Sequence, residues 1–271
     1  MKSLKVISVL LIFASCKSNH QTQVPDKVLI EAGFYPSFHL PVEIKLQKDS
    51  DSGYLTCKAL DYDSANKVIA FDSVLLTKND FDTFFKMLDT VSLLKIPYDT
   101  LDLGMDGITV VASIIQNGQT NKFRTWSPSR YEKPMHYRFL DAIFNLLNKK
   151  LPKLENYIEN VQDYLSYGLG IKIKSENPIV IKMYGGYSID DATKLQSFFD
   201  SLPRNKPVIM DMSNFDGMGT ILHDYFAVCD GTHEKMIWVT PGKLKEYFTE
   251  VGIDTTKMTS SVEIAKRMAA Q

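Results

Sequence analysis

The sequence predicts two modules of mixed helix and strand. An α+β module is expected over residues 29–150, and an α/β module with a mixed sheet and crossover helices over residues 169–271. Apolar and polar residues alternate from Val42 to Leu76, which is typical of antiparallel strands with one solvated face. After residue 169, short apolar runs alternate with helical patterns, which favours parallel strands joined by right-handed crossovers.

Local patterns define the elements of the first half. Alternation predicts strands over residues 42–49, 53–60 and 67–76. The period changes to 3.6 over residues 77–94, which predicts a helix with Thr77 as its N-cap. Asn117 and Gly118 favour the left-handed angles of a tight turn, so they predict a hairpin. A further helix has an apolar stripe consisting of Phe139, Leu140, Ile143, Phe144 and Leu147.

An amphipathic pattern over residues 151–168 predicts a connecting helix between the two modules. Beyond it, strands are expected over residues 169–175, 178–186, 207–213 and 235–241, and helices over residues 190–202, 217–228 and 242–253. A last helix is expected to open at Ser260, because Glu263 three residues later would complete a capping box.

The first sixteen residues, MKSLKVISVLLIFASC, contain two lysines, a short apolar run and small residues before Cys16. The run is too short to span a bilayer, so residues 1–15 are expected to be a signal peptide. The stretch before Cys16 resembles the lipobox of bacterial lipoproteins, with Phe13 where leucine is usual. The resemblance implies acylation of Cys16 and anchoring to a membrane; the alternative is an ordinary cleaved signal peptide.

Residues 16–28 are polar and read as a flexible tether between the anchor and the folded chain. Lys17 stands where an aspartate would resemble an inner-membrane retention signal, which favours the outer membrane of a Gram-negative bacterium.

Composition excludes several classes of function. The chain has 31 Lys and Arg, two of them in the signal peptide, against 32 Asp and Glu, so the mature net charge of −3 gives no sign of nucleic-acid binding. Beyond Cys16 there are two cysteines, Cys57 and Cys229, one in each half. Their apolar surroundings favour buried free thiols over a disulfide.

The runs LGIKIKS, IVIKMYGGYSIDDATKL, VIMDMSNFDGMGTIL and MIWVTPGKLKEYFTEVGID follow one another in the second half. Their order resembles the STAS domain of sulfate transporter tails and anti-sigma factor antagonists, over about a hundred residues. The family's switch turn has a phosphorylatable Ser or Thr just before a glycine. Alignment on Gly217 and Gly219 puts Asp216 at that position, so the resemblance implies a module that is not switched by phosphorylation.

The turn after residue 213 is the first candidate site. It lacks the Gly-Lys-Ser/Thr of a nucleotide-binding loop and the serine of a nucleophile elbow, so neither a nucleotide nor acyl transfer is expected there. Asp216 is expected to cap the following helix, and Phe215, Asp216, Gly217 and Met218 to form a docking surface. The alternative is that Phe215 belongs to the core.

For the other polar residue groups, a structural role is expected rather than a catalytic or metal-binding one. Asp216, His223, Cys229 and His233 lack the spacing of a metal site, and the pair Asp190 and Asp191 is expected to cap a helix. No metal and no cofactor is therefore expected. A second candidate surface consists of Arg124, Trp126, Arg130 and Tyr131, because these residue types concentrate at binding hot spots; the alternative is a Trp packed at a strand end.

These observations predict a lipid-anchored binding or adaptor protein of the cell envelope, without catalysis. Its expected partners are the membrane, through the anchor, and another envelope protein. Two alternatives remain open: an envelope hydrolase with its site between the halves, and an exported immunity-type protein. An enzyme should show converging groups with shifted pKa values, and a binder an exposed apolar or aromatic patch.

Overall fold

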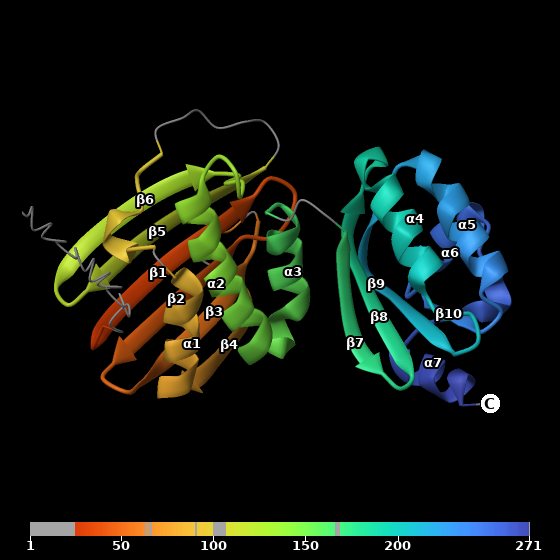
Figure 1. The fold of residues 1–271 in the computed structure, drawn as a ribbon, viewed down its shortest axis with the longest axis horizontal. Coiled ribbons are helices and arrows are strands. Elements are labelled where there is room, and N and C mark those ends of the chain that lie inside the picture. The colour runs from red at the N-terminus through yellow and green to blue at the C-terminus, as the bar shows by residue number, and fades with distance from the viewer. Residues whose placement is uncertain are drawn as a thin grey trace, which may run out of the picture.

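The computed structural model describes residues 25–270, except residues 63, 65–66, 90, 100–106 and 166–168. The described chain is of mixed α/β class and contains two sheets (Figure 1). The first is antiparallel, with the strand order β4-β3-β2-β1-β5-β6, and the second is mixed, with the order β11-β10-β9-β8-β7. The expected class, an antiparallel half followed by a half with parallel strands, is confirmed at this level.

After β1, the first half has the expected order of strands, helix, hairpin and helix. Its strands are β1 (Lys27–Pro36), β2 (Val42–Asp49), β3 (Ser52–Leu60), β4 (Val68–Leu76), β5 (Ile108–Gln116) and β6 (Gln119–Trp126). Its long helices are α1 (Lys78–Leu88) and α2 (Pro134–Lys150), with 3₁₀ turns at Leu93–Lys95 (η1) and Pro152–Leu154 (η2).

Strand β1 is an addition to the expected pattern, because no strand was predicted before Val42. It lies in the middle of the sheet, antiparallel to both β2 and β5. Lys27 and Val28 pair with Asp49 and Lys48, so they belong to the sheet and not to the tether expected over residues 16–28.

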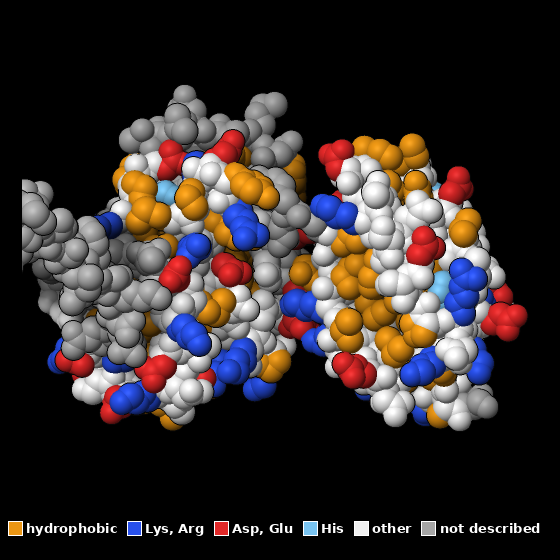
Figure 2. Space-filling model, in the orientation of Figure 1, with side chains coloured by type: hydrophobic (Ala, Val, Ile, Leu, Met, Phe, Trp, Pro, Cys, Tyr) orange, Lys and Arg blue, Asp and Glu red, His pale blue; other side chains and the backbone are white. Residues whose placement is uncertain are grey.

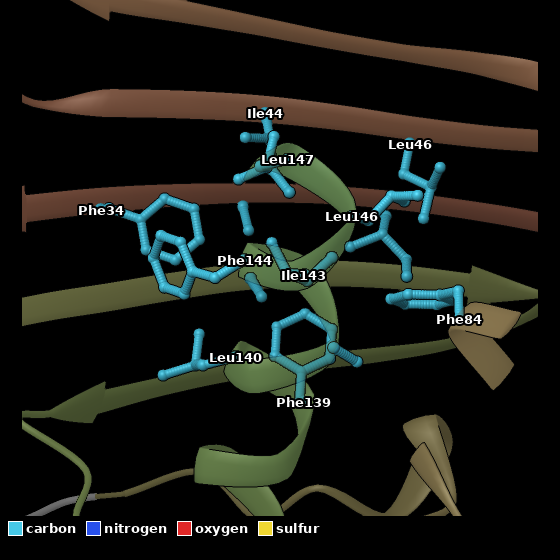
Figure 3. Packing of buried hydrophobic residues seen from close by; sticks show 14 of the residues in the cluster. Phe34, Ile44, Leu46, Phe84, Phe139, Leu140, Ile143, Phe144, Leu146 and Leu147 are labelled. Carbon is cyan, nitrogen blue, oxygen red and sulfur yellow. The ribbon is translucent and has the colours of Figure 1, made fainter. Parts of the chain in front are cut away.

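The core of the first half lies between the sheet and helices α1 and α2 (Figure 1). Figure 3 shows the side chains of α2 pointing toward the strands, with Phe144 against Phe34 and Leu147 against Ile44. The rings of Phe34 and Phe144 lie 5.2 Å apart. Each fully buried Leu, Ile or Phe contributes about 1.5–3 kcal/mol, so this one-sided core is sufficient to hold the helices on the sheet.

Short-range signals were right at one turn and one helix start. Asn117 and Gly118 adopt φ values of 48° and 83° at the hairpin between β5 and β6. Thr77 is the N-cap of α1 and forms a capping box with Asp80. These elements depend on contacts within a few residues, which is why the sequence predicts them.

The second half contains the strands β7 (Gly170–Glu176), β8 (Ile179–Tyr187), β9 (Val208–Met218), β10 (Met236–Val239) and β11 (Met258–Thr259). Its helices are α4 (Ala192–Ser201), α5 (His223–Thr232), α6 (Leu244–Val251) and α7 (Val262–Ala269). β7 and β8 form a hairpin, and β8, β9, β10 and β11 run parallel. Helices α4, α5 and α6 cover one face of the sheet, and α7 packs on the other through Ala265.

The last helix differs from expectation at its start. Ser261, not Ser260, is the N-cap, and its hydroxyl accepts the N–H of Ile264. The capping box expected from Ser260 and Glu263 is therefore wrong by one residue. Ala265 is nevertheless fully buried, with Val262 and Met268 partly buried beside it.

Helix α3 (Glu155–Asp163) lies between the two sheets (Figure 1). Ile158 and Val161 on its apolar side are fully buried in the core of the first half. Its polar side turns to the second half, where Glu155, Asn156 and Glu159 contact side chains of the second sheet. The connecting helix expected over residues 151–168 therefore joins the halves by its side chains as well as by the chain itself.

Candidate functional site

Strand β9 continues through the segment that was expected to be a turn and a helix start. Gly185 pairs with Phe215 and Gly186 with Gly217, so Asp216 is the extra residue of a β-bulge. Gly217 adopts a φ of 133°, which disfavours residues with a side chain. Helix α5 begins only at His223, after a 3₁₀ turn, and its N-cap Leu222 makes no side-chain bond. The prediction that Asp216 caps this helix is wrong.

Phe215 is buried and cannot serve as a docking contact. Its side chain is 5% exposed, and its ring lies 5.4 Å from Tyr187 and 5.5 Å from Phe248. The alternative stated from sequence, that Phe215 belongs to the core, is the correct one. Met218 is half-buried against the same cluster.

The bulge carries Asp216 to the boundary between the halves. Its carboxylate lies 3.2 Å from Nε2 of His39, which follows β1 in the first half. The hydrogen bond with Asp216 is the largest cause that raises the pKa of His39 above its ordinary value, against the lowering effect of burial. Asp216, Gly217 and Met218 also line a shallow hollow of about 460 Å³ with Tyr187 and Tyr247.

Asp163, at the end of α3, is the third titratable group of this cluster. Burial raises the pKa of its carboxyl to about 6, and the nearby charge of Asp216 acts in the same direction. The carboxylate packs directly on Gly185, where an added Cβ would meet Oδ1 at 2.3 Å, and accepts the N–H of Gly186 at 3.4 Å. The glycine pair thus allows α3 to approach the end of β8.

We call His39, Asp163 and Asp216 the junction cluster. Because the pKa of Asp163 is about 6 and the pKa of His39 is raised, these two groups can take up and release protons between weakly acidic and neutral pH. The hydroxyl of Ser188, which lines the neighbouring hollow, donates to Asp191 at 3.3 Å within a capping box. In the same capping box Asp191 accepts the N–H of Ser188 at 3.0 Å, so of the acidic pair Asp190 and Asp191 it is Asp191 that takes the expected capping role.

A buried ion network lies beside the junction cluster. Glu159 is fully buried, and its carboxylate lies 2.8 Å from Nζ of Lys172 and 2.7 Å from Nζ of Lys182. Asn214 on β9 donates to the same carboxylate at 3.0 Å. Burial raises the pKa of Glu155, but the hydrogen bond from Lys174 and the surrounding lysine charges bring it below its ordinary value. Figure 2 shows acidic and basic side chains along this boundary.

In the described part of the chain, the outer face of the first sheet, opposite α1 and α2, carries exposed side chains such as Phe71 and Val111. A depression of about 770 Å³ on this face includes the aromatic residues Tyr35, Phe71 and Tyr98 and the basic residues Lys122 and Arg124. Two ion pairs cross its floor: Lys45 with Glu31 at 3.1 Å, and Lys58 with Glu43 at 2.8 Å.

The second candidate surface is only partly assembled. Arg124 and Trp126 lie on the outer face of β6, and Arg124 lines the depression. Trp126 is half-buried against Gly107, where an added Cβ would meet its ring at 2.6 Å. Arg130 and Tyr131 are exposed in the loop before α2, with Tyr131 90% exposed. Of the four residues, Arg124 is the one that lines the depression.

The remaining candidates have structural surroundings. Cys57 and Cys229 are buried free thiols, and burial raises the pKa of each to about 12. His223 lies 3.4 Å from the hydroxyl of Tyr247, and His233 hydrogen-bonds the carbonyl of Cys229. Across the described ranges, no group of three His, Cys, Asp or Glu side chains could hold a metal ion.

Sequence reasoning missed His39, Asp163, Glu159 and Lys182. One signal was available: Lys182 interrupts the apolar run of β8, and a lysine in a buried strand requires a partner. The identity of that partner, Glu159 on α3, follows only from the packing of the halves.

Comparison with known proteins gives no family for the chain: no protein-family model matches it, and no curated protein matches its sequence. Cys16 and the rest of residues 1–24 lie outside the described residues. Within the described ranges, no helix is long and apolar enough to cross a membrane.

Proposed function

We propose that this chain is a lipid-anchored protein of the cell envelope that binds another envelope protein and catalyses no reaction. Acylated Cys16 is the anchor, in the outer membrane of a Gram-negative bacterium, and the following polar residues are the tether. The second half is a STAS-like module in which Asp216 replaces the phosphorylatable residue. The assignment of the second half to a STAS-like module is supported by the order of strands and helices in the sequence.

One observation carries the binding function: the exposed outer face of the first sheet. It combines exposed aromatic residues with charge, and the exposed fractions of Phe71 and Tyr98 are 61% and 58%. Exposed apolar patches of this kind, rimmed by polar residues, mark protein interaction sites. The opposite charges cancel within each of the two ion pairs on the floor. Lys122 and Arg124 therefore give the depression an excess of positive charge. This charge favours a partner with an acidic contact surface.

The test is capture from solubilised envelopes with the full-length chain as bait. Arg124→Glu reverses one charge in the depression, and Lys194→Glu on α4 makes the same change on an exposed site of the second half. We expect one envelope protein to be retained by the unchanged chain and by Lys194→Glu, and lost with Arg124→Glu. Equal capture by all three proteins contradicts the proposed surface.

The junction cluster favours a second candidate, a hydrolase with its site between the halves. It brings together a histidine and two carboxylates, with the pKa of Asp163 raised to about 6, beside a hollow. A screen with ester, peptide and glycoside substrates distinguishes the two functions. A turnover that disappears with Asp216→Asn and persists with Arg124→Glu supports the hydrolase and overturns the non-catalytic proposal.

A further inference from the structure

Strand β4 is an edge of the first sheet and has unused backbone groups. It is nine residues long and, among the strands that the structure describes, pairs with β3 alone. Leu55 pairs with Val74 and Cys57 with Asp72, and the tight turn between Asp49 and Ser52 fixes which backbone groups of β3 point toward β4. The N–H and C=O groups of Phe71, Ser73 and Leu75 therefore point away from the sheet. Among the described residues, no backbone hydrogen bond outside the ladder reaches β4.

The opposite edge, β6, is covered by the chain itself. The carbonyl of Arg124 accepts the N–H of Asp99 at 2.9 Å, and the carbonyl of Trp126 accepts a bond from Nζ of Lys133 at 3.0 Å. The side chain of Asn121 binds the carbonyls of Leu93 and Ile96, which holds this covering segment in place. Within the described ranges, therefore, one edge of the sheet is covered and the other is not.

Beyond a bulge at Ile69 near its start and the single charge of Asp72, β4 carries little of the usual protection of an exposed edge. Natural edges carry lysine, proline or a bulge that prevents pairing with another strand. β4 has the sequence VIAFDSVLL, in which Asp72 is the one charged residue. The exposed fractions of Ile69, Phe71 and Leu75 are 43%, 61% and 64%. Asp72 accepts the N–H of its neighbour Ser73 at 2.9 Å, so this N–H points away from β3 but is already bonded within the strand.

We propose that β4 pairs antiparallel with β4 of a second copy of this chain and joins the two first sheets into one continuous sheet. The pairing is centred on Ser73, so that Phe71 of each copy lies opposite Leu75 of the other. Directly opposite apolar side chains stabilise an antiparallel pair. In this register Asp72 lies opposite Val74, whereas a register centred on Asp72 places two carboxylates opposite each other.

A second copy fits this edge because the sequence of β4 is self-complementary. A two-fold axis requires a self-complementary surface, and one strand that contributes both members of the Phe71–Leu75 pair meets this requirement. Tyr54 on β3 lies beside Leu75 and is 57% exposed, so it extends the apolar contact on the same face. Phe71 also lines the depression, but the pairing uses the backbone edge of β4 and does not depend on the proposed function.

Light scattering on the full-length protein in detergent, over a range of concentrations, measures the assembly. We expect a dimer for the unchanged chain and a monomer for Phe71→Lys and for Leu75→Lys, each with an unchanged circular dichroism spectrum. Val111→Lys is the matched control, because Val111 is 43% exposed on the same face but lies on the inner strand β5. A monomeric unchanged chain, or a dimer that persists in both lysine variants, overturns the proposal.

Crosslinking tests the register independently. A short bismaleimide should join two copies of Ser73→Cys near the two-fold axis and should not join copies of Thr120→Cys, an exposed position on the covered edge β6. The unchanged chain gives the background, because Cys57 and Cys229 are buried. Equal crosslinking of the two cysteine variants, or none with Ser73→Cys, refutes the pairing. Capture of an envelope protein, and its loss with Arg124→Glu, tests the proposed function. Crosslinking tests the β4 pairing, so one proposal can be refuted while the other stands.

Discussion

Removal of the Lys182 charge should destabilise the contact between α3 and the second sheet. The Lys182 side chain is 4% exposed, and its ammonium group contacts Glu159 at 2.7 Å, Glu155 at 3.3 Å and Asn156 at 2.9 Å. In Lys182→Met the fully buried Glu159 keeps Lys172 and Asn214 but loses its shortest ion pair. Loss of one partner from a buried ion pair costs about 3–5 kcal/mol, and because Lys172 still compensates Glu159 we expect the lower end of this range.

Lys174→Met is the matched control for this prediction. Lys174 pairs with Glu155 in the same network, but its side chain is 40% exposed. Solvent screens such a pair, so its loss should cost only about 0–1 kcal/mol. The difference between the two lysines isolates the effect of burial from that of charge.

Urea unfolding with tryptophan fluorescence gives the free energies. The chain has two tryptophans, Trp126 in the first half and Trp238 in the second, so Trp126→Phe gives a protein whose fluorescence reports the second half alone. For a chain of this size, a loss of about 3–5 kcal/mol corresponds to a fall in melting temperature of roughly 6–20 °C. The double variant Lys182→Met with Glu159→Gln should lose less than the sum of the single variants, because the two residues interact directly. A loss below about 1 kcal/mol for Lys182→Met would falsify the assignment of this network as a buried and coupled one.

Three further predictions concern the core, the junction cluster and the anchor. Phe215→Ala should cost about 3–5 kcal/mol in thermal or urea unfolding because it leaves a cavity among buried rings, and a cost under about 1 kcal/mol contradicts its assignment to the core. The raised pKa of Asp163, at about 6, means that the folded chain binds a proton that the unfolded chain has lost; stability should therefore fall by up to about 3 kcal/mol as pH rises from about 4 to 6. His39 acts in the same direction, since its stabilisation is present below its ordinary pKa and is lost as pH rises through its raised value; Asp163→Asn should flatten the lower part of this slope, and an unchanged slope excludes Asp163 as its source. Cys16→Ala should abolish acyl-chain labelling and release the protein from membranes, and labelling that persists in this variant refutes lipidation at Cys16.

The sequence by itself determined most of the elements of this protein. Alternation and the change of period locate β2, β3, β4 and α1, and in the second half strands and helices occur in the expected order, with the short strand β11 as an addition. Thr77 and the Asn117–Gly118 turn were predicted because each acts on backbone groups only a few residues away. Local patterns also identify the inward faces, as at Ala265.

Tertiary structure decided what becomes of the residues that local patterns leave ambiguous. DGMG after an apolar run resembles a turn and helix start, yet pairing with the glycines of β8 extends β9 and turns Asp216 into a bulge facing His39. Phe215 is buried because α5 and α6 close over this strand, which no period within the strand reveals. The contact of Glu159 with Lys182 joins residues 23 positions apart, and the junction cluster draws on three distant segments. Charges and rings become partners only when separate elements pack, so their pairing is a property of the assembled fold.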